Sequence, residues 1–306
     1  MNEILIFRKG GRKLRELGDV EYLKISTISD NYVEKGTSFL AQHGLSLLIE
    51  VKKGKSVVKI LLDTGQFSST VLYNMRLMNI NPNSVDLIFL SHCHNDHTGG
   101  IVGLLEEMEK KVPVVAHPEI FRENYNFQGI ISSKGMVEEN SREKITEKGG
   151  QIILIKEPFQ IYDGVISTGE VERIIDFEGK GLGTFNLKGG KLIPDDLKDD
   201  MSIVVNVKNK GLFIITGCAH AGILNIINHT VKITGNTKVY GIMGGLHLVG
   251  SSKEKIQKTI NGIADFNPEK LITGHCTGLE AMAEFSSVFG EKFSYMHVGK
   301  IVEVFS

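Results

Sequence analysis

A dense group of potential metal ligands follows the apolar run at residues 85–90. The imidazoles of His92, His94 and His97 and the carboxylate of Asp96 fall within six consecutive positions. Imidazole and carboxylate are the ligands that zinc, manganese and iron bind in proteins. A carboxylate buried beside three imidazoles would be costly without a cation. The sequence therefore predicts a metal site formed by these four side chains.

The spacing of these residues suggests two neighbouring ions. His92 and His94 are two positions apart, so at the end of an extended strand their side chains face the same way. Asp96 and His97 follow where the chain turns toward a helix predicted at residues 99–110. Two ions roughly 3.5–4 Å apart can hold water as hydroxide and stabilise a leaving oxygen. We expect one or two divalent ions, with zinc favoured and manganese or iron as alternatives.

Three further histidines follow apolar strands in the C-terminal half. His220, His247 and His275 each lie within a few residues of such a strand end, and glycines beside them permit close backbone approach. We predict His220 and His275 as metal ligands. His247 and Asp96 are the predicted catalytic residues: His247 would donate a proton to a leaving group, and Asp96 would orient the attacking water or accept its proton. The remaining histidines stand alone in the sequence: His43, His117, His229 and His297.

The bulk composition is that of an ordinary globular protein. The chain has 306 residues, of which 41% are hydrophobic and 23% charged, and a formal net charge of −1, so neither nucleic acid nor a membrane is an expected partner. It lacks the basic and apolar opening of a signal peptide and any apolar run of the roughly 18 residues that span a bilayer. Three cysteines are too few for a disulfide framework. We expect a cytoplasmic protein with a small-molecule substrate, and a homo-oligomer is compatible with these features.

Strand and helix patterns recur in the same order in both halves of the chain. Each half begins with a predicted hairpin and continues with strand–helix units, which favours an α/β fold of two mixed sheets packed face to face with helices outside. Residues 118–200 are less regular, and we interpret them as an insertion, or a lid, within a single domain of residues 1–306. Strands are predicted at residues 45–51, 57–62, 85–90, 113–116, 203–207, 212–215, 238–243 and 270–273, and helices at 67–78, 99–110, 141–148, 223–233, 253–266 and 279–289.

The segment His92-Cys93-His94-Asn95-Asp96-His97 resembles the H-x-H-x-D-H signature of the metallo-β-lactamase superfamily. Asp63, in Leu-Leu-Asp-Thr-Gly after a predicted strand, is similar to an upstream aspartate that supports the metal-binding loop in that family. The resemblance implies a four-layer αββα sandwich. Segments from about Asp30 to the end also resemble the subgroup named after dihydropterin-ribofuranosylaminobenzene-phosphate synthase. They are 29–32, 42–46, 217–222, 244–248 and 274–278.

The resemblance assigns ligands but leaves the middle of the set open. It implies that His92 and His94 bind the first ion, and that Asp96, His97 and His275 bind the second. Most relatives then have a histidine in a turn and an aspartate that bridges both ions after the next strand. Here the turn offers Asp199 and Asp200, and the strand end offers Cys218 and His220. We expect one of the two aspartates to replace the histidine and His220 to replace the bridge. Since imidazole does not bridge two cations as a carboxylate does, one tight ion and one weaker ion are expected.

Three functions are compatible with these residues. The first is a metal-dependent hydrolase that uses a metal-bound hydroxide on a phosphoryl or acyl substrate. The second, implied by the subgroup, is a transferase that joins a dihydropterin methyl diphosphate to an arylamine, so the substrate would be phosphorylated or pterin-like. The third is a non-enzymatic metal-binding protein or an iron redox protein. A diphosphate could meet Arg122, Arg142 and Arg173, although surface arginines are the commoner interpretation.

Overall fold

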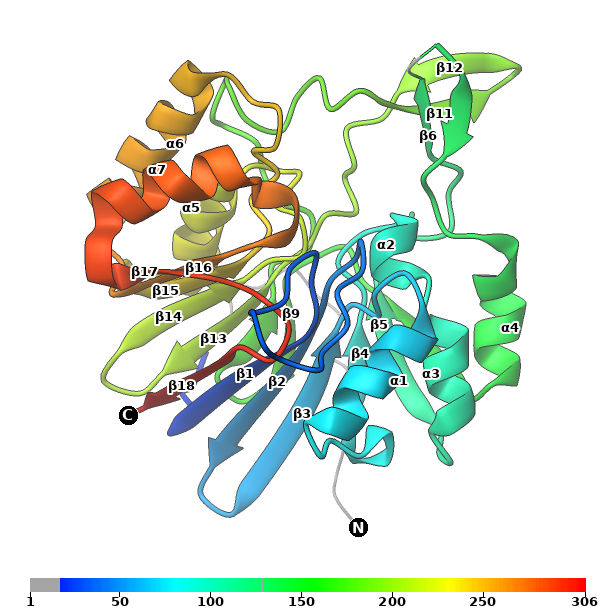
Figure 1. Cartoon of the computed structure of the whole chain (residues 1–306), viewed down its shortest axis with the longest axis horizontal. Helices are drawn as coiled ribbons and strands as arrows, with labels where there is room; N and C mark the ends of the chain where they lie inside the picture. The colour runs from blue at the N-terminus through cyan, green and yellow to red at the C-terminus, as the bar shows by residue number, and fades with distance from the viewer. Residues whose placement is uncertain (1–16, 128) are drawn as a thin grey trace.

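Two seven-stranded sheets pack face to face, and helices cover both outer faces (Figure 1). The computed structural model describes residues 17–127 and 129–306, so the N-terminal residues on which the signal-peptide prediction depends lie outside the described part. The predicted αββα sandwich is confirmed. Among the described residues, every helix falls short of the length and apolar character needed to cross a membrane.

The first sheet is antiparallel on one side and parallel on the other. Its strands in spatial order are β18 (Ile301–Phe305), β1 (Tyr22–Ser29), β2 (Ser46–Lys53), β3 (Ser56–Leu62), β4 (Leu87–Phe89), β5 (Val112–Ala116) and β8 (Gly150–Leu154). Neighbours from β18 to β3 run antiparallel, and those from β3 to β8 run parallel. The parallel half follows from the helical crossovers that join its strands.

The second sheet has the same mixed character. Its strands in spatial order are β17 (Phe293–Tyr295), β16 (Lys270–Thr273), β15 (Val239–Gly244), β14 (Gly211–Ile215), β13 (Ile203–Val207), β10 (Val165–Ser167) and β9 (Phe159–Tyr162). Strands β14 to β17 run parallel, and β13, β10 and β9 complete the sheet antiparallel. The two sheets thus meet with their parallel strands ending at one edge, where function is expected.

Helices shield the outer face of each sheet. The first sheet is covered by α1 (Ser68–Leu77), α3 (Ile101–Glu107) and α4 (Arg142–Glu147), and the second by α5 (Ile223–Thr234), α6 (Lys253–Phe266) and α7 (Leu279–Phe289). Their positions confirm the predicted helices to within a few residues. A further short helix, α2 (Asn95–Thr98), lies inside the histidine motif and was not predicted.

Alternating apolar residues explain why each strand serves two cores. In β14, Phe213 and Ile215 point into the core between the sheets, whereas Leu212 and Ile214 point to the helices α5–α7. Leu61 of β3 likewise faces the helices that cover the first sheet, α1, α3 and α4. A strand buried on both faces carries this near-continuous apolar run, which is why the sequence pattern identified it. The buried cores fix the sheets on which the functional side chains stand.

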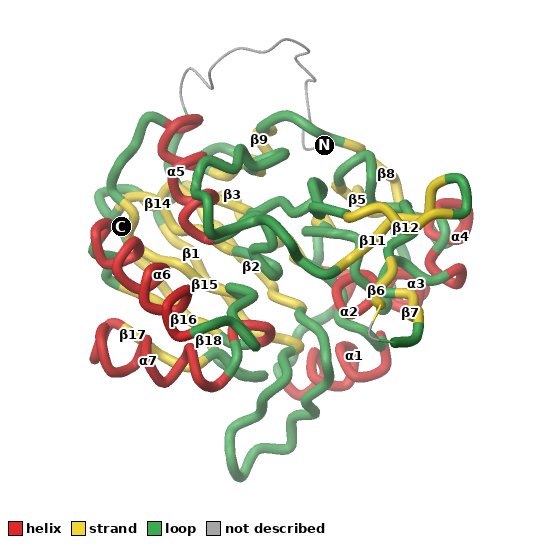
Figure 2. The backbone as a smooth tube through the Cα atoms, turned by 90° about the horizontal axis from the view of Figure 1, so that it is seen from above, coloured by secondary structure: helices red, strands yellow, loops and turns green. Residues whose placement is uncertain are grey.

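Residues 118–200, which we interpret as an insertion, contribute strands to both large sheets and to a small third sheet. β8 extends the first sheet, and β9 and β10 extend the second. Other parts of this segment form a separate four-stranded sheet (Figure 2). Its strands are β12 (Lys191–Pro194), β11 (Thr184–Lys188), β6 (Tyr125–Phe127) and β7 (Ile131–Ser133). These strands are short and largely exposed, so periodicity did not identify them. That the chain is one domain stays a prediction.

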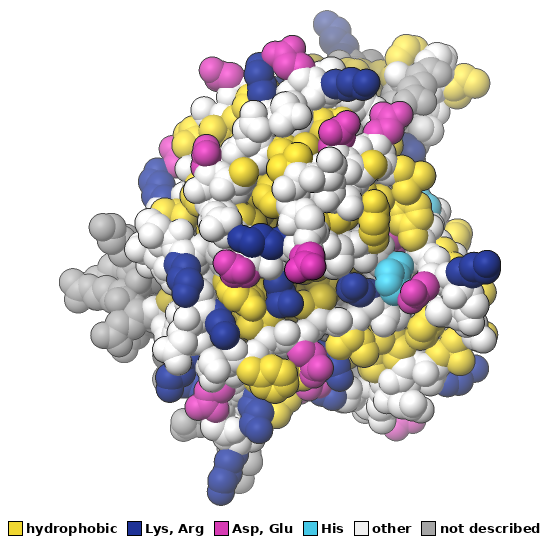
Figure 3. Space-filling view, turned by 60° about the vertical axis from the view of Figure 1, so that its left-hand side comes forward, with side chains coloured by type: hydrophobic (Ala, Val, Ile, Leu, Met, Phe, Trp, Pro, Cys, Tyr) yellow, Lys and Arg dark blue, Asp and Glu magenta, His cyan; other side chains and the backbone are white. Residues whose placement is uncertain are grey.

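The surface carries charges of both signs. Figure 3 shows basic and acidic side chains interspersed on one face, with hydrophobic side chains scattered among them. This mixture agrees with the formal net charge of −1.

Candidate metal centre

The predicted ligands converge at one edge of the sandwich, where strands of both sheets end. His92, His94, Asp96 and His97 follow β4, and three more histidines follow strands of the second sheet. These are His220 after β14, His247 after β15 and His275 after β16. The two edges touch: a Cβ on Gly217 would lie 2.2 Å from Ser91 Oγ, so a glycine is needed at that position.

Three imidazoles form the first group of potential ligands, which we call the imidazole group: His92, His94 and His220. One ligand atom of each lies within 4.8 Å of the others. The ring centroid of His92 is 4.7 Å from that of His94 and 4.7 Å from that of His220. Buried nitrogens here have no hydrogen-bond partner, namely Nε2 of His92 and both ring nitrogens of His220. Such unpaired lone pairs fit a cation ligand set.

A carboxylate joins two imidazoles in the second group, which we call the ion-paired group: Asp96, His97 and His275. His97 Nε2 and His275 Nε2 are 3.1 Å apart. Asp96 Oδ2 lies 3.4 Å from His97 Nε2 and 3.2 Å from His275 Nε2. Three potential ligand atoms within 3.4 Å of one another, with one negative charge among them, suit a divalent ion.

Cys218 lies where the two groups meet. Its Sγ is 3.0 Å from His97 Nε2, and it forms a possible ligand set with His92 and His97. His220, which we expected to replace the bridge, lies instead with His92 and His94. The reason is the turn after β14: it places Cys218 at the strand end between the groups and carries His220 two residues further. In the sequence, Cys218 is one of two candidate residues at this strand end, and only the fold places its sulfur between the groups.

Neither aspartate of the preceding turn lies in a ligand group. Asp199 Oδ2 accepts a hydrogen bond from the Cys93 backbone N–H at 2.7 Å, and its Oδ1 lies 2.7 Å from an Arg122 guanidinium nitrogen. Asp200 Oδ2 accepts from the Ala221 backbone N–H at 2.9 Å, and burial raises its pKa to about 7. Both carboxylates hold backbone, and Asp200 Oδ1 is buried without a hydrogen-bond partner. That one of the two aspartates binds an ion stays a prediction.

Polar partners fix the ring orientation of the ligands. Three of them have Nδ1 occupied: His92 Nδ1 is 2.9 Å from Ser91 Oγ, His97 Nδ1 is 2.6 Å from Asp63 Oδ2, and His275 Nδ1 is 3.0 Å from Asn31 Oδ1. Their Nε2 atoms are thereby left for an ion. Asp63 also accepts from the backbone N–H and the hydroxyl of Ser91. Metal-binding histidines are commonly held by such partners.

The two groups differ in electrostatics. Burial lowers the pKa of His92 and His220 well below the ordinary value and that of His94 to about 4, so all three imidazoles are neutral at pH 7. Burial also opposes charge on His97, but Asp96 and Asp63 outweigh it and raise its pKa. His97 and His275 in turn lower the pKa of Asp96 against the effect of burial.

Unfavourable backbone conformations gather around the centre. Asp63, Ala219, His247 and His275 have positive φ angles of 58°, 54°, 46° and 49° without being glycine. Such residues cost free energy and persist where the surrounding structure holds them, often at functional sites. Here the conformational free energy is spent at residues whose side chains or neighbours lie in one small region, the candidate metal centre.

The other histidines divide between the centre and the rest of the molecule. The His247 ring lies against that of His220 with centroids 4.1 Å apart and planes tilted by 51°, and its Nδ1 has no partner. His43, which appeared isolated in the sequence, has Nε2 3.5 Å from Asp96 Oδ2, and its ring stacks on His275. Its position on a loop after β1 gave no periodic signal. The remaining three bind residues elsewhere: His117, His229 and His297.

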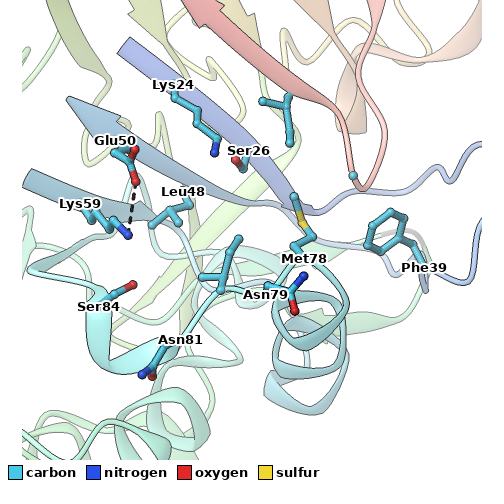
Figure 4. Close-up of a pocket in the computed structure, with 13 residues that line it drawn as sticks. Lys24, Ser26, Phe39, Leu48, Glu50, Lys59, Met78, Asn79, Asn81 and Ser84 are labelled. Atoms are coloured by element: carbon cyan, nitrogen blue, oxygen red, sulfur yellow. Dashed lines mark ion pairs between the residues drawn. The ribbon is translucent and has the colours of Figure 1, made fainter. Parts of the chain in front are cut away.

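The three arginines also have other partners. Arg122 is buried in ion pairs with Asp195 and Asp199, Arg142 stacks on Phe121, and Arg173 donates to backbone carbonyls. A surface pocket of about 440 Å³ lies on the first sheet beside the end of α1 (Figure 4). Its lining includes Lys24, Glu50 and Lys59 but none of the clustered histidines, so it is separate from the centre.

Comparisons with known proteins agree with this geometry. A family model described as the metallo-beta-lactamase superfamily matches residues 42–275. The chain is 38% identical over 293 residues to 7,8-dihydropterin-6-methyl-4-(beta-D-ribofuranosyl)-aminobenzene-5'-phosphate synthase of Methanocaldococcus jannaschii, covering 95% of this chain and 99% of that one. An uncharacterised protein of the same organism is 33% identical, covering 92% and 100%. The crystal structure of Tm1679, a metal-dependent hydrolase of the beta-lactamase superfamily, superposes with a TM-score of 0.77 at 24% identity, covering 93% and 100%.

Proposed function

Because the chain belongs to the metallo-beta-lactamase superfamily, we propose that it is a metal-dependent hydrolase acting on a phosphoryl or acyl substrate. The observation that carries the proposal is the pair of adjoining ligand groups. His92 belongs to one and His97 to the other, with ring centroids 4.2 Å apart. Two such groups side by side are the arrangement that two-ion hydrolysis requires.

Divalent ions held by these groups would lower the pKa of water and polarise the substrate's phosphoryl or carbonyl oxygen. The imidazole group would hold the first ion, and the ion-paired group with Cys218 the second. Zinc suits this mixture of nitrogen, oxygen and sulfur ligands.

Acid–base work falls to Asp96 and two histidines at the margin. The Asp96 side chain is 15% exposed, so its carboxylate reaches the open side of the centre and can accept a proton from an attacking water. His247, with its free Nδ1, can donate to the leaving group. His43 is exposed beside Asp96 and can exchange that proton with solvent.

A transferase is the second candidate, and the 38% identity to the M. jannaschii synthase supports it. In that reaction the ions would bind the diphosphate of a dihydropterin methyl diphosphate, and an arylamine would be the nucleophile. The same ligand groups serve both reactions, so the nucleophile distinguishes them. An assay that supplies both pterin diphosphate and arylamine tests whether the condensation product or free pterin alcohol forms.

The proposal is tested by metal content together with activity. We expect about two zinc ions per chain and hydrolysis of phosphodiesters or lactones. His92→Ala should abolish the activity, and His297→Ala, away from the centre, should leave it unchanged. A chain that binds no ion after reconstitution with zinc, manganese or iron would exclude the hydrolase. Condensation without hydrolysis would replace it with the transferase.

A further inference from the structure

The four-stranded sheet and its flanking loops bind three consecutive residues of the histidine motif. The Cys93 backbone N–H donates to Asp199 Oδ2, and the Asn95 backbone N–H donates to the Lys134 carbonyl at 2.8 Å. Between them, His94 Nε2 lies 3.2 Å from Asn124 Oδ1. Asn124 is fully buried. The four-stranded sheet and its flanking loops therefore contact the histidine motif directly, whether or not they also cover the metal centre.

The amide of Asn124 has its orientation fixed by its other neighbour. Its Nδ2 donates to Asp195 Oδ2 at 2.7 Å. Asp195 is held in turn by Arg122, whose Nε donates to the same oxygen at 2.8 Å. Since a carboxylate only accepts hydrogen bonds, the amide nitrogen must face Asp195 and the amide oxygen must face His94.

An acceptor at His94 decides which ring nitrogen carries the proton. Neutral imidazole has one N–H donor and one bare acceptor nitrogen, so a bond to Asn124 Oδ1 places the proton on Nε2. Nδ1 is then bare and available to an ion. The other ligands with a ring partner have the opposite arrangement, with Nδ1 occupied: His92, His97 and His275.

We propose that Asn124, oriented by Asp195 and Arg122, is a positioning residue that fixes the tautomer and ring direction of His94. This inference rests on the proposed metal centre. In this arrangement the Nε2–H of His94 donates a hydrogen bond to Asn124 Oδ1, and Nδ1 is directed to the first ion. Partners of this kind typically contribute 10–100-fold to metal affinity.

The test combines one disrupting variant, one conservative variant and one control. Asn124→Ala removes the acceptor. Asn124→Asp keeps a side chain of the same shape with an oxygen that can face His94, and it leaves Asp195 as the acceptor for the Arg122 Nε–H. Asn126→Ala alters the same strand, β6, two residues along. All are compared with wild type for zinc affinity by chelator competition, and for the His94 tautomer by nitrogen-15 NMR of the ion-free protein.

The inference predicts an Nε2–H tautomer for His94 in wild type and its loss in Asn124→Ala, with zinc binding to the first site weakened about 10–100-fold. Asn124→Asp should keep the Nε2–H tautomer, and Asn126→Ala should change neither property. An unchanged tautomer and affinity in Asn124→Ala would overturn the positioning role while leaving the hydrolase proposal intact. A wild-type chain with the tautomer but without ion binding would instead refute the proposed function. If Asn124→Ala does not fold, an Asn124→Asp protein that folds without the Nε2–H tautomer overturns the inference.

Discussion

The imidazole group and the ion-paired group lie side by side but solve the problem of burial differently. His92, His94 and His220 are neutral, and buried nitrogens among them lack partners. In the ion-paired group, Asp96 lies against both His97 and His275, and Asp63 holds the far side of His97. One group is therefore incomplete without a cation, whereas the other is balanced by a proton.

This difference predicts that the two ions are bound with different affinities and different pH dependence. An unsatisfied buried polar atom costs about 1–3 kcal/mol, so an ion in the imidazole group relieves a cost already present. An ion in the ion-paired group must first displace a proton from His97. We therefore expect tighter and less pH-dependent binding in the imidazole group.

Among the variants that compare the two groups, the largest effect is expected from His220→Ala. His220 is a buried member of the imidazole group with both ring nitrogens free, so its loss should remove one ion per chain and reduce hydrolysis by about 10³-fold, or about 4 kcal/mol in activation free energy. Elemental analysis and steady-state kinetics measure both. Retention of two ions would mean that this group does not bind as proposed. His229→Ala, on α5, is a matched control.

Removal of the ions should lower thermal stability next most strongly. A ligand present at about 1,000 times its dissociation constant stabilises the native state by about 4 kcal/mol. Chelation should therefore lower the melting temperature of wild type, and the decrease should be smaller in His220→Ala. Calorimetry with and without chelator measures this difference. An equal decrease in both proteins would show that the ion-paired group accounts for the stabilisation.

The pH dependence should separate the groups more finely. Because Asp96 and Asp63 raise the pKa of His97, its pairing stabilises the ion-free protein fully below pH 6.5 and fades as pH rises through the raised pKa. An ion that displaces this proton should bind about tenfold tighter per pH unit until that pKa is passed, and release of the Cys218 thiol proton should steepen the dependence further. The imidazole group should show little change above pH 6, since its histidines are already neutral. Zinc titrations of His220→Ala and His275→Ala at pH 6, 7 and 8 compare the two groups, and equal slopes would contradict the distinction.

Cys218→Ser should have the smallest effect. The sulfur lies 3.0 Å from His97 Nε2, at the junction of the groups, and serine is a poorer ligand for zinc. We expect the second ion to weaken by about tenfold while the first is unaffected. The cobalt-substituted wild type should show a thiolate charge-transfer absorption that the variant lacks. Its absence in wild type would assign Cys218 a packing role only.

Much of the fold could be predicted because buried strands and amphipathic helices carry periodic apolar patterns. The helix at 253–266 and the strand at 203–207 were predicted with their observed bounds. The strands β6, β7, β11 and β12 were missed because they are short and largely exposed, so no buried face gives them an apolar period. Within the centre, the dense motif at 92–97 was evident, but the partnership of His43 with Asp96 was not, since 53 positions separate them.

The sequence by itself determined the layered α/β architecture, the family and the presence of a histidine motif at a strand end. These features can be inferred from local sequence, because side-chain type and spacing within single segments are sufficient to indicate them. Only the tertiary structure decided that His220 joins His92 and His94, that Cys218 lies between the groups and that Asn124 faces His94. Those relations depend on how two sheets and a small third sheet meet, and contacts between distant segments leave no periodic trace in the sequence.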